Sequence, residues 1–432
     1  MSTTKQPRRR VSQRSLMASG VLLGALTLLT YSAAETPAPA LTTLYSFSGE
    51  NGDGAGPYAG VLYKANGSLY GTTSFGGIFN GGTVFELTPP VSGGDWTETV
   101  LHSFGAGNDG TYPYAGVVAG TNGVLYGTTN YGGASGMGTV YELIPPGTPG
   151  GAPSAWTETV LYNFSGSDGA YPYASVTLAR SGTLYGTTEL GGSFGYGTVF
   201  ELTPPAGADG AWTETVLRNF SGSDGSYPYA VLAIASGTLY GTTTMGGSSD
   251  KGAVFKLTAP GVPGGAWTES VVHSFNGSDE GVPYGGVVLG ANGAIYGTTA
   301  GSVSGGNGTV FELSPPTGTS KVWTESVLYK FTGESDGGAP HAAPTFGPDG
   351  TLYGTTFGGG TGKRFNGSGL LFQLTPPVGT GAWTENVLYT FLGGGDGATP
   401  TAPLTAGPSG VYYGTTLGGG TLGQGTVFAL KP

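Results

Sequence analysis

The sequence predicts an all-β protein folded as one seven-bladed β-propeller, with four antiparallel strands in each blade. Three observations support this prediction. A set of short motifs recurs seven times, each repeat holds four short segments rich in β-forming residues, and the two ends of the chain carry complementary parts of one repeat. No segment beyond residue 34 has a sustained helical period.

The repeat is marked most clearly by the tetrapeptide Tyr-Gly-Thr-Thr, whose copies lie 55 to 60 residues apart. These copies begin at Tyr70, Tyr126, Tyr185, Tyr240, Tyr296, Tyr353 and Tyr413. Each unit also has an aspartate that is followed four residues later by a proline, at Asp53/Pro57, Asp109/Pro113, Asp168/Pro172, Asp224/Pro228, Asp279/Pro283, Asp336/Pro340 and Asp396/Pro400. Each of the six tryptophans opens a Trp-Thr-Glu triplet. Markers that keep step over the whole chain indicate a repeat architecture.

Within one unit, four strands are expected, and the second unit illustrates them. They cover residues 115–119, 125–129, 138–144 and 156–164, and they are separated by turn signals rich in Gly, Asn, Pro and Asp. Four strands and a period above 50 residues match a propeller blade. A β-helix coil is shorter than this period, and a helical solenoid needs amphipathic helices.

The chain ends provide an independent test of closure. The last unit stops at residue 432 without a Trp-Thr-Glu strand, whereas residues 41–47 are an orphan copy of the second half of that strand. Pairing residues 41–47 with residues 426–430 completes the seventh blade and closes the ring, which removes an open sheet edge. We therefore predict one propeller domain over residues 41–432.

The first 34 residues are expected to be a signal peptide. Five basic residues precede an apolar run over residues 16–31, and Ser32, Ala33 and Ala34 follow it. The alternative is a retained membrane anchor, but the run is shorter than the roughly 20 residues of a spanning helix, which favours cleavage. We expect a secreted, cell-surface or periplasmic protein with no membrane contact after cleavage.

Charge and composition exclude several function classes. Without residues 1–34 the chain has ten basic and 26 acidic residues, so its surface repels nucleic acid and anionic lipid. The absence of cysteine excludes disulfides, thiolate metal sites and cysteine nucleophiles. We expect a monomer without a cofactor or a bound metal.

The repeat markers resemble those of the GloVer tandem-repeat proteins, whose units carry Leu-Tyr-x-Phe, Asp-Gly-x-x-Pro-Tyr-Ala, Leu-Tyr-Gly-Thr-Thr and Gly-Thr-Val-Phe-x-Leu-Thr-Pro. The resemblance covers residues 41–432. It implies an exported bacterial surface or secreted protein, often with a C-terminal sorting anchor. This chain departs from that pattern, because Pro432 ends the last expected strand without an anchor. The family carries over no catalytic residues.

The residue after each repeat proline is a candidate ligand contact. This position holds Tyr58, Tyr114, Tyr173, Tyr229, Tyr284 and His341, and Thr401 in the last unit. If the Asp-Pro loop leads from the outer strand of one blade to the inner strand of the next, these side chains lie near the mouth of the central channel. There an aromatic ring would stack on a sugar or another flat ligand. The alternative is packing between blades with locally satisfied hydroxyls, which the recurrence of the position favours.

Two further sets of residues have competing interpretations. The repeat aspartates are candidates for calcium binding, but each loop usually offers one carboxylate, which favours a turn in which the aspartate accepts backbone N–H groups. Lys363 and Arg364, in an insertion of the sixth unit, are the only adjacent basic pair after residue 34. They are a candidate anion contact, against the alternative of a tolerated surface insertion.

No catalytic residues are predicted. The three histidines lie in different units, and nucleophile-elbow, phosphate-loop and histidine metal motifs are missing. We therefore favour a non-catalytic binding or structural propeller for a glycan or protein partner. The alternative is an extracellular polysaccharide hydrolase or lyase acting at the channel mouth. If the protein is an enzyme, we expect carboxylates at the channel mouth in only one or two blades. If it is a binding protein, we expect aromatic residues spread around the channel mouth.

Overall fold

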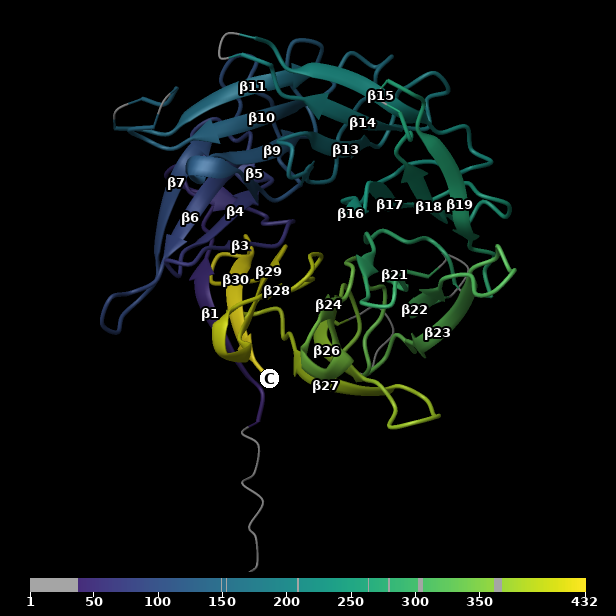
Figure 1. Ribbon diagram of the computed structural model, residues 1–432. Helices are drawn as coiled ribbons and strands as arrows, with labels where there is room; N and C mark the ends of the chain where they lie inside the picture. The colour runs from purple at the N-terminus through teal and green to yellow at the C-terminus, as the bar shows by residue number, and fades with distance from the viewer. Residues whose placement is uncertain are drawn as a thin grey trace, which may run out of the picture. The chain divides into compact units, whose positions relative to one another are not determined.

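Seven four-stranded antiparallel sheets follow one another along the chain and are arranged in a ring, as the computed structural model shows (Figure 1). The structure describes residues 38–432, apart from residues 149, 153, 208–209, 263, 279, 302–305 and 361–366. Residues Pro39–Pro432 make up one unit. The expected signal peptide, Lys363 and Arg364 lie outside the described residues. The described part of the chain contains no helix with the length and hydropathy of a membrane span.

The first six blades take their strands in chain order from the inner to the outer edge. Blades 1 to 3 consist of β3 (Leu62–Tyr63), β4 (Leu69–Thr73), β6 (Thr83–Thr88) and β7 (Thr97–Ser103); β8 (Val118–Ala119), β9 (Leu125–Thr129), β10 (Thr139–Ile144) and β11 (Thr157–Asn163); and β12 (Thr177–Leu178), β13 (Leu184–Thr188), β14 (Thr198–Thr203) and β15 (Thr213–Asn219). Blades 4 to 6 consist of β16 (Ala233–Ala235), β17 (Thr238–Thr243), β18 (Ala253–Thr258) and β19 (Thr268–Ser274); β20 (Val288–Leu289), β21 (Ile295–Thr299), β22 (Thr309–Ser314) and β23 (Thr324–Lys330); and β24 (Thr345–Phe346), β25 (Leu352–Thr356), β26 (Leu370–Thr375) and β27 (Thr384–Thr390). In three blades a 3-10 turn joins the two inner strands, at Thr121–Gly123, Pro348–Gly350 and Pro408–Gly410.

The seventh blade is built from both ends of the chain. It combines β28 (Thr405–Ala406), β29 (Tyr412–Thr416) and β30 (Thr426–Lys431) with β1 (Ala40–Ser46), which pairs with β30 from Ala40↔Lys431 to Ser46↔Thr426. Figure 1 shows this purple and yellow pairing at the seam of the ring. The predicted closure by the N-terminal strand is confirmed.

The inner strands are shorter than predicted. In blade 2 the predicted strand over residues 115–119 reduces to Val118–Ala119. Residues 114–117 leave the sheet because they line the central cavity, and the carbonyl of Ala115 accepts a hydrogen bond from the neighbouring blade instead of a ladder bond. The inner strand therefore ends where the cavity wall begins.

The hydrophobic core lies between adjacent blades. One cluster joins Val84 and Phe104 of blade 1 to Leu125 and Tyr141 of blade 2, and a corresponding cluster at the seam joins blade 7 to blade 1. Every inter-blade cluster contains a phenylalanine that follows an outer strand and is at most 1% exposed: Phe47, Phe104, Phe164, Phe220, Phe275, Phe331 and Phe391. The recurring Leu-Tyr-x-Phe motif thus encodes the contact between blades.

The first threonine of each Tyr-Gly-Thr-Thr motif ties its blade to the next one. In all seven blades its hydroxyl donates a hydrogen bond of 2.8 to 3.3 Å to a backbone carbonyl of the following blade. The pairs are Thr72 with Ala115, Thr128 with Ala174, Thr187 with Ala230, Thr242 with Gly285, Thr298 with Ala342, Thr355 with Ala402 and Thr415 with Ala59. The last pair closes the ring at the seam. These bonds satisfy carbonyls that the short inner strands leave unpaired.

The glycine of the same motif lies under an aromatic ring from the paired strand. Gly71 pairs with Phe85, and a Cβ at Gly71 would lie 2.5 Å from a ring carbon of Phe85. We expect Gly71→Ala to destabilise the protein by about 1–3 kcal/mol, because the added methyl group overpacks a closed contact. Gly261→Ala is the control, since a Cβ there has no neighbour within 4 Å. Urea unfolding measures both, and equal midpoints for the two variants would contradict this prediction.

Candidate functional site: a cavity ringed by aromatic residues

Two sets of loops meet at one end of every blade. The strands alternate in direction, so the loop between the second and third strands and the loop that enters the next blade lie at the same end. They are bridged there by a small sheet of β2 (Gly54–Ala55) and β5 (Phe75–Gly76) in blade 1, and by single bridges such as Thr111↔Tyr131 and Ala170↔Leu190 in later blades. The entering loop then passes into the central cavity.

The central cavity has a volume of about 410 Å³ and is lined by all seven blades. This volume falls within the roughly 300–1,000 Å³ of typical small-molecule sites. Small residues such as Ala59, Gly116 and Ala174 also line the cavity. The wall is tightly packed, because a Cβ at Gly116 would lie 3.0 Å from the carbonyl oxygen of Gly60. The cavity is therefore a preformed part of the fold.

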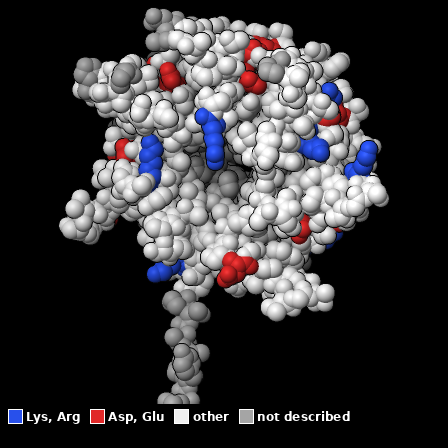
Figure 2. Space-filling model, viewed as in Figure 1, with Lys and Arg blue, Asp and Glu red and all other residues white. Residues whose placement is uncertain are grey.

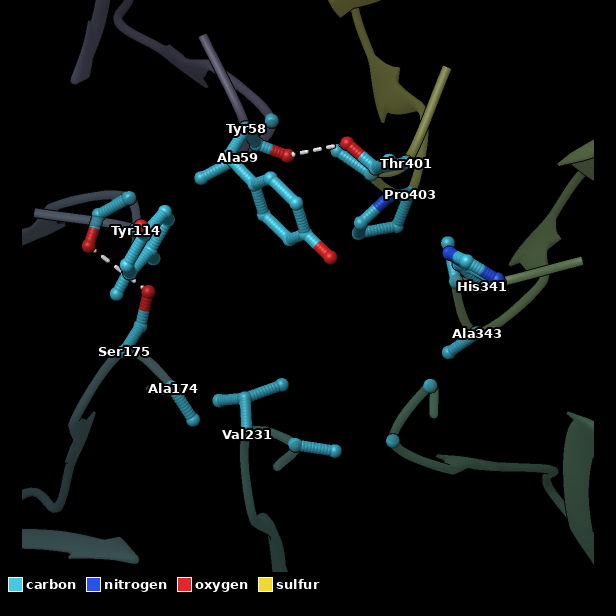
Figure 3. Close-up of a pocket in the computed structure, with 18 of the residues that line it drawn as sticks. Tyr58, Ala59, Tyr114, Ala174, Ser175, Val231, His341, Ala343, Thr401 and Pro403 are labelled. Atoms are coloured by element: carbon cyan, nitrogen blue, oxygen red, sulfur yellow. Dashed lines mark hydrogen bonds between the residues drawn. The ribbon is translucent and has the colours of Figure 1, made fainter. Parts of the chain in front are cut away.

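The candidate residues Tyr58, Tyr114, Tyr173, Tyr229, Tyr284 and His341 all line this cavity, and we call them the channel ring. Successive rings are in contact. The centroids of Tyr114 and Tyr173 are 4.9 Å apart in a stacked arrangement, those of Tyr173 and Tyr229 are 4.8 Å apart, and those of Tyr284 and His341 are 4.8 Å apart. In Figure 3 the side chain of Tyr58 points into the cavity, and Thr401 and Pro403 lie between it and His341. The structure thus brings the six candidates together.

The channel ring is separate from the cores between the blades. None of its six members belongs to an inter-blade cluster, and Tyr284 is 38% exposed. In blade 7 the same position holds Thr401, whose hydroxyl donates to the carbonyl of Tyr58 at 2.7 Å (Figure 3). The aromatic residues therefore pack against one another and face the cavity.

A hydrogen bond holds one of these rings in place. The hydroxyl of Tyr229 donates to Glu189 at 2.7 Å. Burial raises the pKa of Tyr58, Tyr173 and Tyr229, and the bond to Glu189 adds to the effect on Tyr229. The hydroxyls therefore stay protonated and available as donors and acceptors.

The cavity wall is uncharged. None of the described residues that line it is Asp, Glu, Lys or Arg. Burial lowers the pKa of His341 to about 4, so this imidazole is neutral at neutral pH, and it stacks on Phe357 with centroids 4.8 Å apart. Glu189 accepts a hydrogen bond from the channel-ring residue Tyr229 and is not itself among the described lining residues. An uncharged aromatic wall suits a neutral ligand.

The repeat aspartates hold their own loops. Asp279 lies outside the described residues, and each of the other six accepts a hydrogen bond of 2.6 to 3.1 Å from a nearby backbone N–H. The donors are Ser48 to Asp53, Gly105 to Asp109, Ser165 to Asp168, Ser221 to Asp224, Thr332 to Asp336 and Leu392 to Asp396. This geometry matches the predicted turn. The described residues contain no group of three or more His, Asp or Glu side chains arranged to hold a metal ion.

The outer strand supplies a second partner to most of these aspartates. His102 contacts Asp109 at 3.1 Å, Tyr162 donates to Asp168 at 2.5 Å, and Arg218 pairs with Asp224. His102 therefore occupies a repeated strand position that holds tyrosine or arginine in other blades. Figure 2 shows a face of the molecule that is hollowed at its centre. The charged side chains on this face are scattered over its surface.

Together, the fold and the cavity define a seven-bladed β-propeller with an aromatic central pocket. The chain belongs to the Gloeobacter/Verrucomicrobia repeat family, whose model matches residues 27–152, 148–324 and 262–432. No curated protein matches this chain.

Solved structures share the fold at low sequence identity. A polysaccharide lyase of family PL25, an ulvan lyase, is 10% identical with a TM-score of 0.55, and the match covers 90% of this chain and 95% of the lyase. A putative 6-phosphogluconolactonase from Bacteroides uniformis is 15% identical with a TM-score of 0.50, and the match covers 80% of this chain and 88% of that one. At these identities the likeness concerns the fold alone.

A second group of aromatic residues, which the sequence did not single out, begins next to the channel-ring residue Tyr114. Phe75, Tyr131 and Tyr196 are each about 40% exposed, at 42%, 44% and 39%. Tyr112, Tyr171 and Tyr227 each stand directly before a repeat proline. Their signal in the sequence is an aromatic residue that occurs at a repeated position in some blades and not in others.

Proposed function

We propose that this protein is an exported, non-catalytic propeller that binds a neutral carbohydrate in its central cavity. The observation that carries the proposal is the channel ring, in which five tyrosines and a neutral histidine surround an uncharged cavity. Tyrosine suits this task because its face packs against the C–H groups of a sugar while its hydroxyl forms hydrogen bonds. The preformed wall reduces the entropy lost on binding.

The enzymatic alternative lacks a supporting arrangement in this cavity. Glycoside hydrolysis commonly needs two carboxyl groups that flank the scissile bond. The described lining carries none, and Glu189 is engaged by Tyr229. The fold similarity to an ulvan lyase does not transfer its chemistry, because one propeller fold hosts many functions.

The proposal also includes export of the protein and a monomeric state. The basic and apolar leader over residues 1–34 supports a secreted, cell-surface or periplasmic location without membrane contact after cleavage. We infer a monomer that presents its cavity to carbohydrate; a protein ligand is the competing outcome of the test below.

Binding to a glycan array, followed by calorimetry with soluble oligosaccharides, tests the proposal. We expect neutral sugars to bind and Tyr173→Ala to weaken the binding at least about tenfold, which corresponds to about 1.4 kcal/mol. Tyr389→Ala is the control, since Tyr389 lies on the outer strand of blade 6, outside the cavity. Thermal unfolding verifies that both variants are folded at the assay temperature.

Two outcomes overturn the proposal. The absence of carbohydrate binding, together with capture of a protein, would assign the cavity to a protein ligand. The release of new reducing ends or unsaturated sugars from a bound polysaccharide would assign it to an enzyme. Binding without any product supports the proposal.

A further inference from the structure

Aromatic side chains continue outward from the channel ring over blades 1 to 4. We call Phe75, Tyr112, Tyr131, Tyr171, Tyr196 and Tyr227 the aromatic arc. Its ring centroids are 5.4 Å apart for Phe75 and Tyr112, 5.9 Å for Tyr112 and Tyr131, and 4.9 Å for Tyr131 and Tyr171. Tyr196 and Tyr227 form a further pair at 6.2 Å. The first four rings are thus a continuous row.

The arc is joined to the cavity at Tyr114. This channel-ring tyrosine follows Tyr112 by two residues, and its backbone N–H donates to the carbonyl of Tyr112 at 2.9 Å. Burial raises the pKa of Tyr114, and the nearby hydroxyls of Tyr131 and Tyr112 add to this effect. A ligand that occupies the cavity at Tyr114 therefore reaches the arc without crossing a gap.

The fold itself does not require the arc. The second residue after Tyr-Gly-Thr-Thr is Phe75, Tyr131, Leu190 and Met245 in blades 1 to 4, whereas blades 5 to 7 have Gly301, Gly358 and Gly418 there. Blades 6 and 7 still form the same backbone bridge, Gly338↔Gly358 and Ala398↔Gly418. Because glycine supports the same local structure, the aromatic side chains at this position serve something other than the fold.

The residues before the prolines lead to the same conclusion. All seven adopt a left-handed backbone, with φ between 53° and 64°: Gly56, Tyr112, Tyr171, Tyr227, Val282, Ala339 and Thr399. Glycine is the unstrained choice in this conformation. Blades 2 to 4 nevertheless place tyrosine there, and its backbone is held firmly, since Tyr112 donates to Gly81 at 2.7 Å and accepts from Asn130 at 3.1 Å. The rings are therefore presented on rigid loops.

We propose that the aromatic arc extends the carbohydrate site, so that the ligand is a neutral chain of several pyranose units with equatorial hydroxyls. This inference rests on the proposed function of the cavity. Such sugars have flat C–H faces that stack on successive tyrosine rings, and their hydroxyls bond to the phenol groups. Anionic polysaccharides are disfavoured by the excess of acidic residues. One end of the chain occupies the cavity and the following units lie on the arc.

Calorimetry with short and long oligosaccharides tests this inference on the mature protein. The probes are cellobiose with cellohexaose, and maltose with maltohexaose. We expect one hexasaccharide to bind at least about tenfold more tightly than its disaccharide, because additional sugar units contact the arc. The double variant Tyr112→Ala/Tyr131→Gly should lose this advantage of length and keep its affinity for the disaccharide.

The repeats provide matched replacements. Alanine before the proline copies Ala339, and glycine at the second position copies Gly301, so the double variant carries residues that the fold accepts elsewhere. Val282→Ala, at the same position in blade 5, is the control and should leave the advantage of length unchanged. Tyr173→Ala should weaken the binding of both lengths.

The outcomes separate the inference from the function on which it rests. If disaccharides bind but hexasaccharides bind no tighter, or if the double variant keeps the full advantage of length, the extended site is wrong and the cavity proposal stands. If no carbohydrate binds at all, the cavity proposal has failed as well.

Discussion

Removal of residues 40–47 should abolish the cooperative thermal unfolding transition of this protein. β1 occupies the outer edge of blade 7 and pairs with β30 along its whole length. Phe47 is fully buried against Phe85 of blade 1, with centroids 5.1 Å apart, and Leu41 packs against the core shared with blade 6. The deletion therefore opens two inter-blade cores and exposes the edge of β30.

The size of the effect follows from the buried residues. Truncating one buried phenylalanine typically costs about 3–5 kcal/mol, whereas the whole folding free energy of a domain is about 5–15 kcal/mol. The loss of Phe47 together with a complete strand should exceed that margin. Phe47→Ala alone should lower the melting temperature substantially while leaving a folded ring.

Two comparisons make this test specific to closure. A chain that starts at Pro39 retains β1 and should unfold like the mature protein. A synthetic peptide of residues 39–48, added to the deletion variant, should restore the transition, because an edge strand binds in trans through the same ladder. An unchanged melting temperature in the deletion variant would refute the contribution of β1 to the ring.

The architecture was predictable because its determinants recur. Each copy of Tyr-Gly-Thr-Thr repeats the same contacts, a glycine under the ring of the paired strand and a threonine that bonds to the next blade. The sequence also shows that residues 41–47 copy part of a strand that the last repeat lacks. Repetition made these signals stronger than any single motif.

The position of the channel ring was predicted as one of two alternatives, and its packing was not predicted. Placement after the repeat proline made Tyr58 and its counterparts candidates for the channel mouth, whereas the recurrence of the position favoured packing between blades. In the structure these residues line the cavity and lie outside the inter-blade clusters. The neutral state of His341 and the pairing of Tyr229 with Glu189 depend on neighbours distant in sequence. The aromatic arc could not be recognised from recurrence, because tyrosine occurs at the positions of Tyr112 and Tyr131 in some blades and is replaced in others.

The inner strands are shorter than predicted because their backbone partners also lie far away in the sequence. Residues 115–117 have the composition of a strand, yet their backbone groups bond to the adjacent blade and the cavity wall. Strand propensity describes a half-buried surface rather than a particular partner. Only the closed ring determines which partner these residues receive.

The Trp-Thr-Glu glutamates are expected to make the protein most stable in mildly acidic solution. Glu98, Glu158, Glu214 and Glu385 each have a buried carboxyl oxygen without a hydrogen-bond partner among the described residues. Burial raises the pKa of each of them to about 7. The negative charges of Asp53, Asp168 and Asp336 add to this effect for Glu98, Glu214 and Glu385.

The direction of the pH dependence follows from proton binding. Between the ordinary glutamate pKa of 4.5 and about 7, the folded protein binds more protons than the unfolded chain, so its stability falls as the pH rises through this window. At the acidic end of the pH range, the protonation of Asp168 determines how the stability changes. Burial tends to raise the pKa of Asp168, but hydrogen bonds from Tyr162 and Ser165 lower it below its ordinary value, so stability is lost again when this aspartate is protonated. We expect the highest melting temperature near pH 5.

Glu214→Gln isolates the contribution of one glutamate. Glutamine resembles the protonated form, so the variant should melt at a higher temperature than the wild type at pH 8 and at nearly the same temperature at pH 5. Glu269→Gln is the matched control from the next blade. There Arg218 lies 3.7 Å from Glu269 and compensates its charge, so the gain at pH 8 should be smaller. A melting temperature that rises steadily from pH 5 to pH 8, or equal gains in both variants, would show that these glutamates are ionised without penalty in the folded ring.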